Sequence, residues 1–156
     1  MSRSEAEIGA GKPLVRPARR DDFAAVGAVI AASALDSPPL LANAAIFGEA
    51  AESGTFYVAT AAGIVIGVLG AQSIAYDGEK PYTLWIEVVA VHPNWRGRGM
   101  GTALYRALGH WAVQRGVQGA LTAATDDPAV RALHQRVGFG THRDNLLLWR
   151  FNSDTA

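Results

Sequence analysis

Residues His92 to Leu104 read HPNWRGRGMGTAL, a stretch with three glycines and two arginines. It follows the almost wholly apolar run Leu84–Val91 and precedes a segment with apolar residues at helical spacing. A glycine-rich turn that leads into a helix presents several unpaired backbone N–H groups to one point. The helix dipole and the arginines add positive charge there. The stretch therefore predicts a site for a phosphate or pyrophosphate group.

Two well-known phosphate-binding loops do not account for this stretch. The nucleotide-triphosphate loop ends in Gly-Lys-Ser or Gly-Lys-Thr, an ending that is absent here. The dinucleotide fingerprint Gly-x-Gly-x-x-Gly fits Gly97 and Gly99, but Thr102 stands where the third glycine belongs. The plainer alternative is a glycine-rich turn with solvated arginines. It leaves unexplained why turn, charge and helix start coincide.

Hydrophobic periodicity predicts an α/β fold, with a mixed sheet and helices on its faces. We predict strands at 14–18, 55–60, 64–73, 83–91, 119–124 and 146–151. We predict helices at 22–32, 40–52, from the glycine cluster to 116, and at 128–136. The second and third strands form a hairpin, and residues 76–81 form a loop. The continuous apolarity of residues 83–91 predicts a central strand that is covered on both faces.

The composition is that of one folded domain. The chain has 156 residues, 49% of them hydrophobic, and a formal net charge of zero. A neutral chain argues against general nucleic-acid binding. The lack of cysteine excludes disulfides, thiolate zinc sites and a cysteine nucleophile. We expect residues 1–12 to be a frayed terminus and residues 13–156 to form a single domain.

Targeting and metal signals are weak. The first twelve residues do not form a signal peptide, and the apolar runs are too short for a membrane span. These features predict a cytoplasmic protein without membrane contact. The four histidines are scattered without a ligand-like spacing, so no metal site is expected.

Two motifs resemble landmarks of the GCN5-related N-acetyltransferase (GNAT) family. Arg96-x-x-Gly99-x-Gly101, between VVAVHP and TALYRAL, resembles the family's acetyl-CoA signature. HQRVGF, at 134–139, resembles its helix ending in Leu-Tyr-x-x-x-Gly-Phe. The resemblance extends from about residue 14 to 151. It implies the acyl-CoA N-acyltransferase fold, with a mostly antiparallel sheet of six to seven strands. It also implies acetyl-CoA as cosubstrate, an amine acceptor and a possible homodimer.

The resemblance further implies which residues bind coenzyme A. Backbone N–H groups of the glycine cluster would hold the pyrophosphate, through Arg96, Gly97, Arg98, Gly99, Met100, Gly101 and Thr102. The strand of Val89, Ala90 and Val91 would diverge from the strand at 121–124. It would then pair with the pantetheine arm like an added strand. The Val89 N–H would face the thioester carbonyl, where negative charge develops.

Glu87 is the candidate general base. It is the only charged residue in the run Leu84–Val91. A buried carboxylate needs a partner or a raised pKa, and a raised pKa suits a base. Several members of the family carry a glutamate at the matching strand position. The alternatives are a structural glutamate paired with arginine, or one at the rim of the strand.

The chain departs from the family pattern at two positions. His134 stands where the family usually has a tyrosine that protonates the departing thiolate. Histidine can also donate this proton near neutral pH, but it could equally line the cleft, contact the cofactor or be a packed histidine. Asp127 replaces an asparagine near the pantetheine, and it could serve as a helix N-cap instead.

The resemblance implies that the acceptor is a primary amine of a small molecule or peptide. In this family it is contacted by the segments at 33–50 and 76–82. The sequence leaves two other functions open. The domain could be a non-catalytic acyl-CoA-binding sensor or interaction module, or an acyltransferase that uses a longer acyl group or an alcohol acceptor.

Overall fold

One seven-stranded sheet organises the molecule. The structure, a computed structural model, describes residues 13–36, 38–76 and 79–152. The strands lie in the order β1-β2-β3-β4-β5-β7-β6. β4 and β5 are parallel, and the other neighbouring pairs are antiparallel. This sheet confirms the mixed, mostly antiparallel sheet expected from the sequence.

The elements have the following bounds. The strands are β1 (Leu14–Pro17), β2 (Phe56–Ala61), β3 (Ile64–Tyr76), β4 (Glu79–Val91), β5 (Gly119–Ala123), β6 (Gly140–Arg143) and β7 (Leu146–Arg150). The α-helices are α2 (Phe23–Ala32), α3 (Ala44–Glu52), α4 (Met100–Gln114) and α5 (Pro128–Val137). Three short 3-10 helices are η1 (Arg20–Asp22), η2 (Pro39–Leu41) and η3 (Pro93–Trp95).

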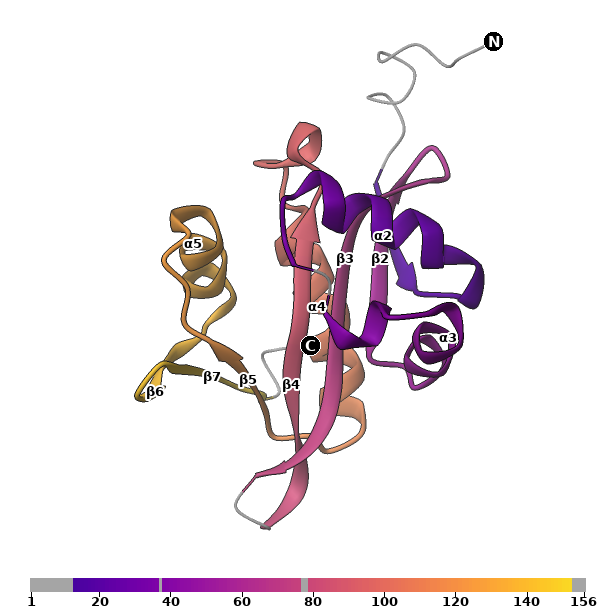
Figure 1. Ribbon diagram of the computed structural model, residues 1–156. Coiled ribbons are helices and arrows are strands. Elements are labelled where there is room, and N and C mark those ends of the chain that lie inside the picture. The colour runs from indigo at the N-terminus through magenta and orange to yellow at the C-terminus, as the bar shows by residue number, and fades with distance from the viewer. Residues whose placement is uncertain (1–12, 37, 77–78, 153–156) are drawn as a thin grey trace, which may run out of the picture.

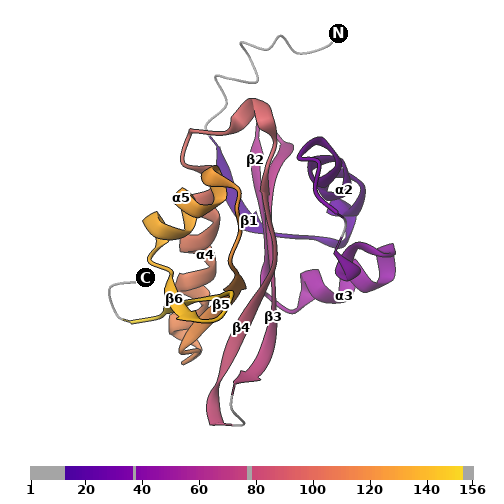
Figure 2. The same ribbon diagram turned by 60° about the vertical axis from the view of Figure 1, so that its left-hand side comes forward.

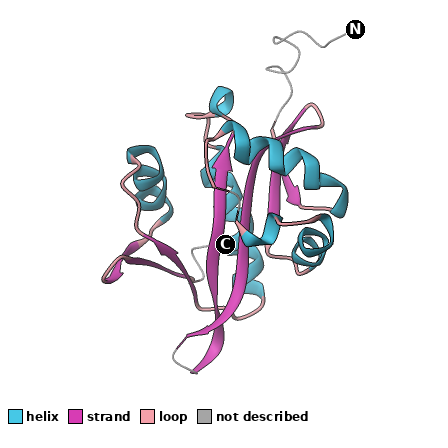
Figure 3. Ribbon diagram, in the orientation of Figure 1, coloured by secondary structure: helices cyan, strands magenta, loops and turns pink. Residues whose placement is uncertain are grey.

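Helices cover both faces of the sheet (Figures 2 and 3). Helices α2 and α3 lie on one face, where Ile30 and Phe47 belong to one buried cluster. Helix α4 lies on the other face, where Leu104 and Leu108 belong to a second cluster. β4 is the middle strand of the sheet, as its continuous apolarity predicts. Side chains of β4 belong to both clusters.

Because of a β-bulge at Glu87, β4 contributes side chains to both clusters. Ile86 pairs with Ala71 and Val88 pairs with Gly70, which leaves Glu87 without a partner in the ladder with β3. Ile86 belongs to the cluster on the α4 face, and Val88 to the cluster on the α2 face. The extra residue therefore reverses which face the following side chains cover.

Two predicted segments differ from the structure. The helix expected over 40–52 is split into η2 and α3, because Asn43 begins a new helix. The Asn43 Oδ1 accepts a hydrogen bond from the Ile46 N–H at 2.9 Å. The loop expected over 76–81 is also wrong in extent, since Tyr76 pairs with Glu79 and both strands reach this turn. Residues 77 and 78 lie outside the described residues.

β6 is the strand that the sequence analysis did not find. It forms a hairpin with β7 through a two-residue turn, in which Asp144 has a φ of 47°. Asp tolerates this left-handed conformation. The strand Gly140–Arg143 is mostly exposed and lacks an apolar face, so periodicity gives no signal there.

The expected frayed terminus, residues 1–12, lies outside the described residues, and it stays a prediction together with the single-domain assignment. Within the described ranges, no helix combines the length and apolarity that crossing a bilayer requires.

Candidate active site

The central feature of the site is the divergence of β4 from β5. The two strands pair only from Thr83 to Trp85 and from Gly119 to Leu121. Beyond that point they separate, as Figure 1 shows. Described residues of no other strand pair with this edge of β4 from Ile86 onward. Backbone groups on that edge are therefore exposed to any ligand between the strands.

A cleft of about 290 Å³ lies at this divergence. Its walls come from the end of β4, the glycine cluster, the start of α4 and one side of α5. Ten of the residues expected to bind cofactor line it: Val89, Ala90, Val91, Arg96, Gly97, Gly99, Met100, Gly101, Thr102 and Asp127. Arg98, His134 and the catalytic candidate Glu87 are not among its lining residues.

The N-terminus of α4 opens into this cleft without a cap. Gly99 begins the helix with a φ of 82°, a conformation that glycine adopts without strain. No side chain caps the helix, and its first turn contains no acidic residue. Its first hydrogen bond runs from the Ala103 N–H to the Gly99 carbonyl. The N–H groups of the preceding residues are thus free to bind an anion.

The two arginines of the cluster differ in position. Arg96 lines the cleft, and its Nε donates a hydrogen bond to the Val91 carbonyl at 3.1 Å. Arg98 instead stacks over the buried Trp95, with its guanidinium carbon 4.7 Å from the ring centroid. Arg96 therefore places its charge at the wall of the cleft, whereas the contact of Arg98 with Trp95 stabilises the turn.

Gly101 has a packing role in addition to its place in the cleft. A Cβ atom at this position would lie 2.7 Å from Leu133 Cδ2. The Leu133 side chain of α5 therefore occupies the space that a side chain at position 101 would need. Gly101 thus lets Leu133 pack directly against the first turn of α4.

Glu87 is half-buried at the bulge of β4. Burial raises the pKa of its carboxyl above the ordinary value of 4.5. No hydrogen bond or ion pair joins it to any described residue, so the arginine-paired alternative is not observed. Val89, two residues further along the strand, lines the cleft.

His134 is packed in the protein interior, which is one of the alternatives that the sequence left open for it. It is 3% exposed, and its Nε2 lies 3.0 Å from the Tyr105 hydroxyl. Its ring also packs against Phe139, with centroids 5.0 Å apart. Burial lowers the pKa of His134 below 6.5. Its Nδ1 is buried without a hydrogen-bond partner among the described residues.

Asp127 is the N-cap of α5, which confirms one of the two roles weighed for it. Its Oδ1 accepts hydrogen bonds from the N–H groups of Ala129 and Val130, at 2.9 and 3.2 Å. The same residue lines the cleft. Its carboxylate therefore has a structural function that an asparagine oxygen could also perform.

Several residues at the site were not found by sequence reasoning. Burial raises the pKa of Tyr105 well above its usual range, so its phenol stays neutral. Its spacing to Leu108 and Ala112 on α4 was a usable signal of burial. The others line the cleft from distant segments: Ser33, Leu35, Trp95, Ala129, Val130, Ala132, Leu133 and Arg136. For Ser33 and Leu35 the sequence held no signal beyond the expected acceptor segment 33–50.

The other segment expected to contact the acceptor is 76–82, and its side chains are not among those that the structure describes. Among the described residues, no three or more His, Asp or Glu side chains lie together in a group that could hold a metal ion.

The family model of the acetyltransferase (GNAT) family matches residues 25–139. No curated protein sequence matches the chain. A GNAT family acetyltransferase from Brucella melitensis, in complex with acetyl-CoA, is 18% identical, with a TM-score of 0.69 over 91% of this chain and 90% of that one. YhbS, a GNAT family N-acetyltransferase from Escherichia coli in complex with CoA, is 23% identical, with a TM-score of 0.69 over 94% and 85%.

A GCN5-related N-acetyltransferase from Kribbella flavida is 18% identical, with a TM-score of 0.70. The match covers 87% of this chain but only 34% of that one. At these identities the solved structures establish the fold alone. The family model, by contrast, spans well over half of the chain and both sequence landmarks. The chain belongs to the GNAT acetyltransferase family.

Proposed function

We propose that this protein transfers an acetyl group from acetyl-CoA to a primary amine of a small molecule or peptide, by direct attack in a ternary complex. One observation carries the proposal. The uncapped N-terminus of α4 and the unpaired edge of β4 line the same cleft. The first suits a pyrophosphate, and the second suits an amide-containing chain that hydrogen-bonds like an added strand.

The residues of β4 would supply the chemistry. The amine must lose a proton before it can act as a nucleophile, and Glu87 would accept this proton directly or through water. Its unpaired, half-buried carboxylate supports this role, because a raised pKa makes it a better proton acceptor. The Val89 N–H would donate to the oxygen that becomes negative during the transfer.

The departing thiolate needs a proton, and the role of His134 as its donor stays a prediction. The Tyr105 hydroxyl is the group that contacts the His134 ring at Nε2. Two variants test the role: His134→Gln removes the acid, and His134→Tyr restores the usual residue of the family. A proton donor predicts that turnover falls in the first variant and returns in the second.

Coenzyme A release tests the proposed function. Released thiol is followed with a thiol reagent across amines, amino acids, aminoglycosides and peptide N-termini, with acceptor-free reactions as the control. The protein has no cysteine and so gives no background signal. We expect release that depends on one acceptor class. If acetyl-CoA does not bind at all, the proposal is wrong.

A non-catalytic acyl-CoA sensor is the second candidate. The observation that favours it is the position of His134, which does not line the cleft although it occupies the family's proton-donor position. This candidate predicts acetyl-CoA binding in a direct titration with no acceptor-dependent release. Acceptor-dependent turnover that Glu87→Gln abolishes would exclude it.

A further inference from the structure

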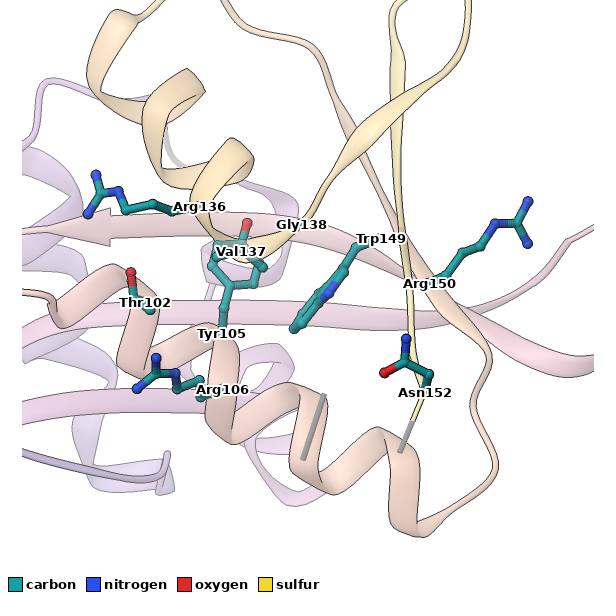
Figure 4. Close-up of a pocket in the computed structure, with 9 residues that line it drawn as sticks. All are labelled: Thr102, Tyr105, Arg106, Arg136, Val137, Gly138, Trp149, Arg150 and Asn152. Carbon is teal, nitrogen blue, oxygen red and sulfur yellow. The ribbon is translucent and has the colours of Figure 1, made fainter. Parts of the chain in front are cut away.

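A second cavity, of about 370 Å³, lies beside the cleft. Figure 4 shows its lining, which comes from α4, the end of α5 and the end of β7. Its residues are Thr102, Tyr105, Arg106, Arg136, Val137, Gly138, Trp149, Arg150 and Asn152. Nothing in the proposed reaction uses this cavity.

The cavity is strongly positive although the whole chain has a net charge of zero. Arg106, Arg136 and Arg150 reach it from three different elements, and no acidic residue lines it. No hydrogen bond or ion pair joins these three side chains to any other described residue. The side chains of all three arginines are exposed, so an anion that enters the cavity from solvent can reach their guanidinium groups.

Two of the arginines lie on either side of one hydroxyl. In Figure 4, the guanidinium groups of Arg106 and Arg136 flank Thr102, whereas Arg150 lies beyond Trp149 and points away. Thr102 and Arg106 are four residues apart on α4, so they share one face of the helix. Thr102 and Arg136 also line the cleft, which makes the cavity its direct neighbour.

We propose that this cavity is a phosphate-binding site, in which Arg106, Arg136 and the Thr102 hydroxyl hold one phosphate group. Guanidinium groups bind phosphate oxygens through paired N–H donors, and a threonine hydroxyl adds a third donor.

The phosphate could come from two sources. One is the 3′-phosphate of coenzyme A bound in the cleft, a reading that rests on the proposed function. The other is a separate phosphorylated small molecule that binds whether or not the protein is an acetyltransferase. Both use the same chemistry at the same three residues.

Titration calorimetry with coenzyme A and 3′-dephospho-coenzyme A tests the first source. The proteins are wild type, Arg106→Gln and the matched control Arg131→Gln, whose exposed side chain on α5 lines neither cavity. Arg106 lines only the second cavity, so its loss leaves the cleft intact. If the cofactor is the source, coenzyme A binds wild type and the control about 10- to 100-fold more tightly than the dephospho form. In Arg106→Gln the difference disappears.

Inorganic phosphate tests the second source. It is titrated into each protein at constant ionic strength, alone and with saturating 3′-dephospho-coenzyme A, and the melting temperature is followed. A rise in wild type and Arg131→Gln, but not in Arg106→Gln, supports a separate ligand. Equal melting temperatures without ligand verify that the variants fold. If Arg106→Gln matches wild type in both titrations, the phosphate site is wrong. If neither form of coenzyme A binds, the proposed function fails and the phosphate titration alone decides the site.

Discussion

Glu87 combines three features that rarely occur together. It is half-buried, it has no ion-pair or hydrogen-bond partner among the described residues, and it occupies a bulge in the central strand. A structural glutamate would be expected to have a partner, because an unpaired carboxylate is costly to bury. Such a cost is commonly found where a group has a chemical role.

We predict that Glu87→Gln lowers kcat/KM by about 10²- to 10⁴-fold, the usual contribution of a general base. In wild type, kcat/KM rises with pH through the pKa of Glu87, which burial raises above 4.5. The variant lacks this rise because glutamine does not titrate. Rates from pH 4.5 to 9 in the coenzyme A release assay measure both effects.

Stability separates a catalytic effect from damage to the fold. Glu87→Gln removes a charge that burial disfavours, so its free energy of unfolding at pH 7 should equal or exceed that of wild type. Asp144→Asn, an exposed change in the turn between β6 and β7, is the matched control and should leave kcat/KM unchanged. A pH profile for Glu87→Gln that parallels wild type would contradict the base assignment.

His134 makes the fold sensitive to acid. Burial lowers its folded pKa, so protons bind more readily to the unfolded chain, where the pKa is near 6.5. The free energy of unfolding therefore falls as the pH drops below about 6.5, until the folded pKa is passed. Urea unfolding between pH 4.5 and 8 measures this slope. In His134→Gln the slope over this window should be smaller.

Tyr105→Phe separates the hydrogen bond from the titration. It leaves His134 Nε2 without the hydroxyl that lies 3.0 Å away. We expect a loss of about 1 to 3 kcal/mol, the usual cost of an unsatisfied buried polar group. The loss should be largest where His134 is neutral.

The pH slope of stability has its own test. If the free energy of unfolding of His134→Gln falls as steeply with decreasing pH as that of wild type, groups other than His134 cause the acid sensitivity.

At the scale of elements, α4 and α5 meet beside the cleft, where Gly101 faces the Leu133 side chain. Gly101→Ala should destabilise the protein by about 1 to 3 kcal/mol, because the added Cβ would press against Leu133. Gly27→Ala in α2 is the matched control, since nothing lies within 4 Å of its Cβ position. That change should stabilise by about 0.5 to 1 kcal/mol. Thermal unfolding of both variants measures the contrast.

Relief of the contact provides the second test. Leu133→Ala removes the atoms that the new Cβ would meet, so the double variant should lose less stability than the two single changes predict together. Additive losses would mean that Gly101 is needed for another reason, such as the backbone conformation of the turn.

Some elements could be predicted from the sequence, and others could not. The turn at Gly97–Gly101, the central strand and α5 could be predicted, because glycine spacing, continuous apolarity and a proline start are local signals. The bulge at Glu87 could not, since it depends on how β3 pairs with β4. The burial of His134 is a second example, because it follows from the packing of Tyr105 and Phe139 on other elements.

At the scale of the whole molecule, two buried clusters share one sheet. β4 sends Leu84 and Ile86 into the cluster on the α4 face, and Val88 and Ala90 into the cluster on the α2 face. Loss of either cluster exposes one side of the central strand. The two sides should therefore unfold together.

We predict a single unfolding transition that a change in either cluster shifts as a whole. Leu108→Ala on the α4 face and Ile30→Ala on the α2 face should each cost about 2 to 5 kcal/mol, the usual range for emptying a buried leucine or isoleucine site. Three of the four tryptophans, Trp95, Trp111 and Trp149, belong to or pack against the α4-side cluster, and Trp85 belongs to neither cluster. In a Trp85→Phe background, tryptophan fluorescence therefore reports on the α4 face.

The decisive measurement is urea unfolding of Ile30→Ala, followed by tryptophan fluorescence and by far-ultraviolet circular dichroism. In the Trp85→Phe background the change is on the α2 face and the fluorescence reporters are on the other, so only coupling through the sheet can move both midpoints equally. Ile46→Ala, at a site 40% exposed on α3, is the control and should shift neither midpoint appreciably. A circular dichroism midpoint that falls while the fluorescence midpoint stays would mean that the two faces unfold separately. The cleft, whose walls belong mainly to the α4 face, could then persist while α2 and α3 are unfolded.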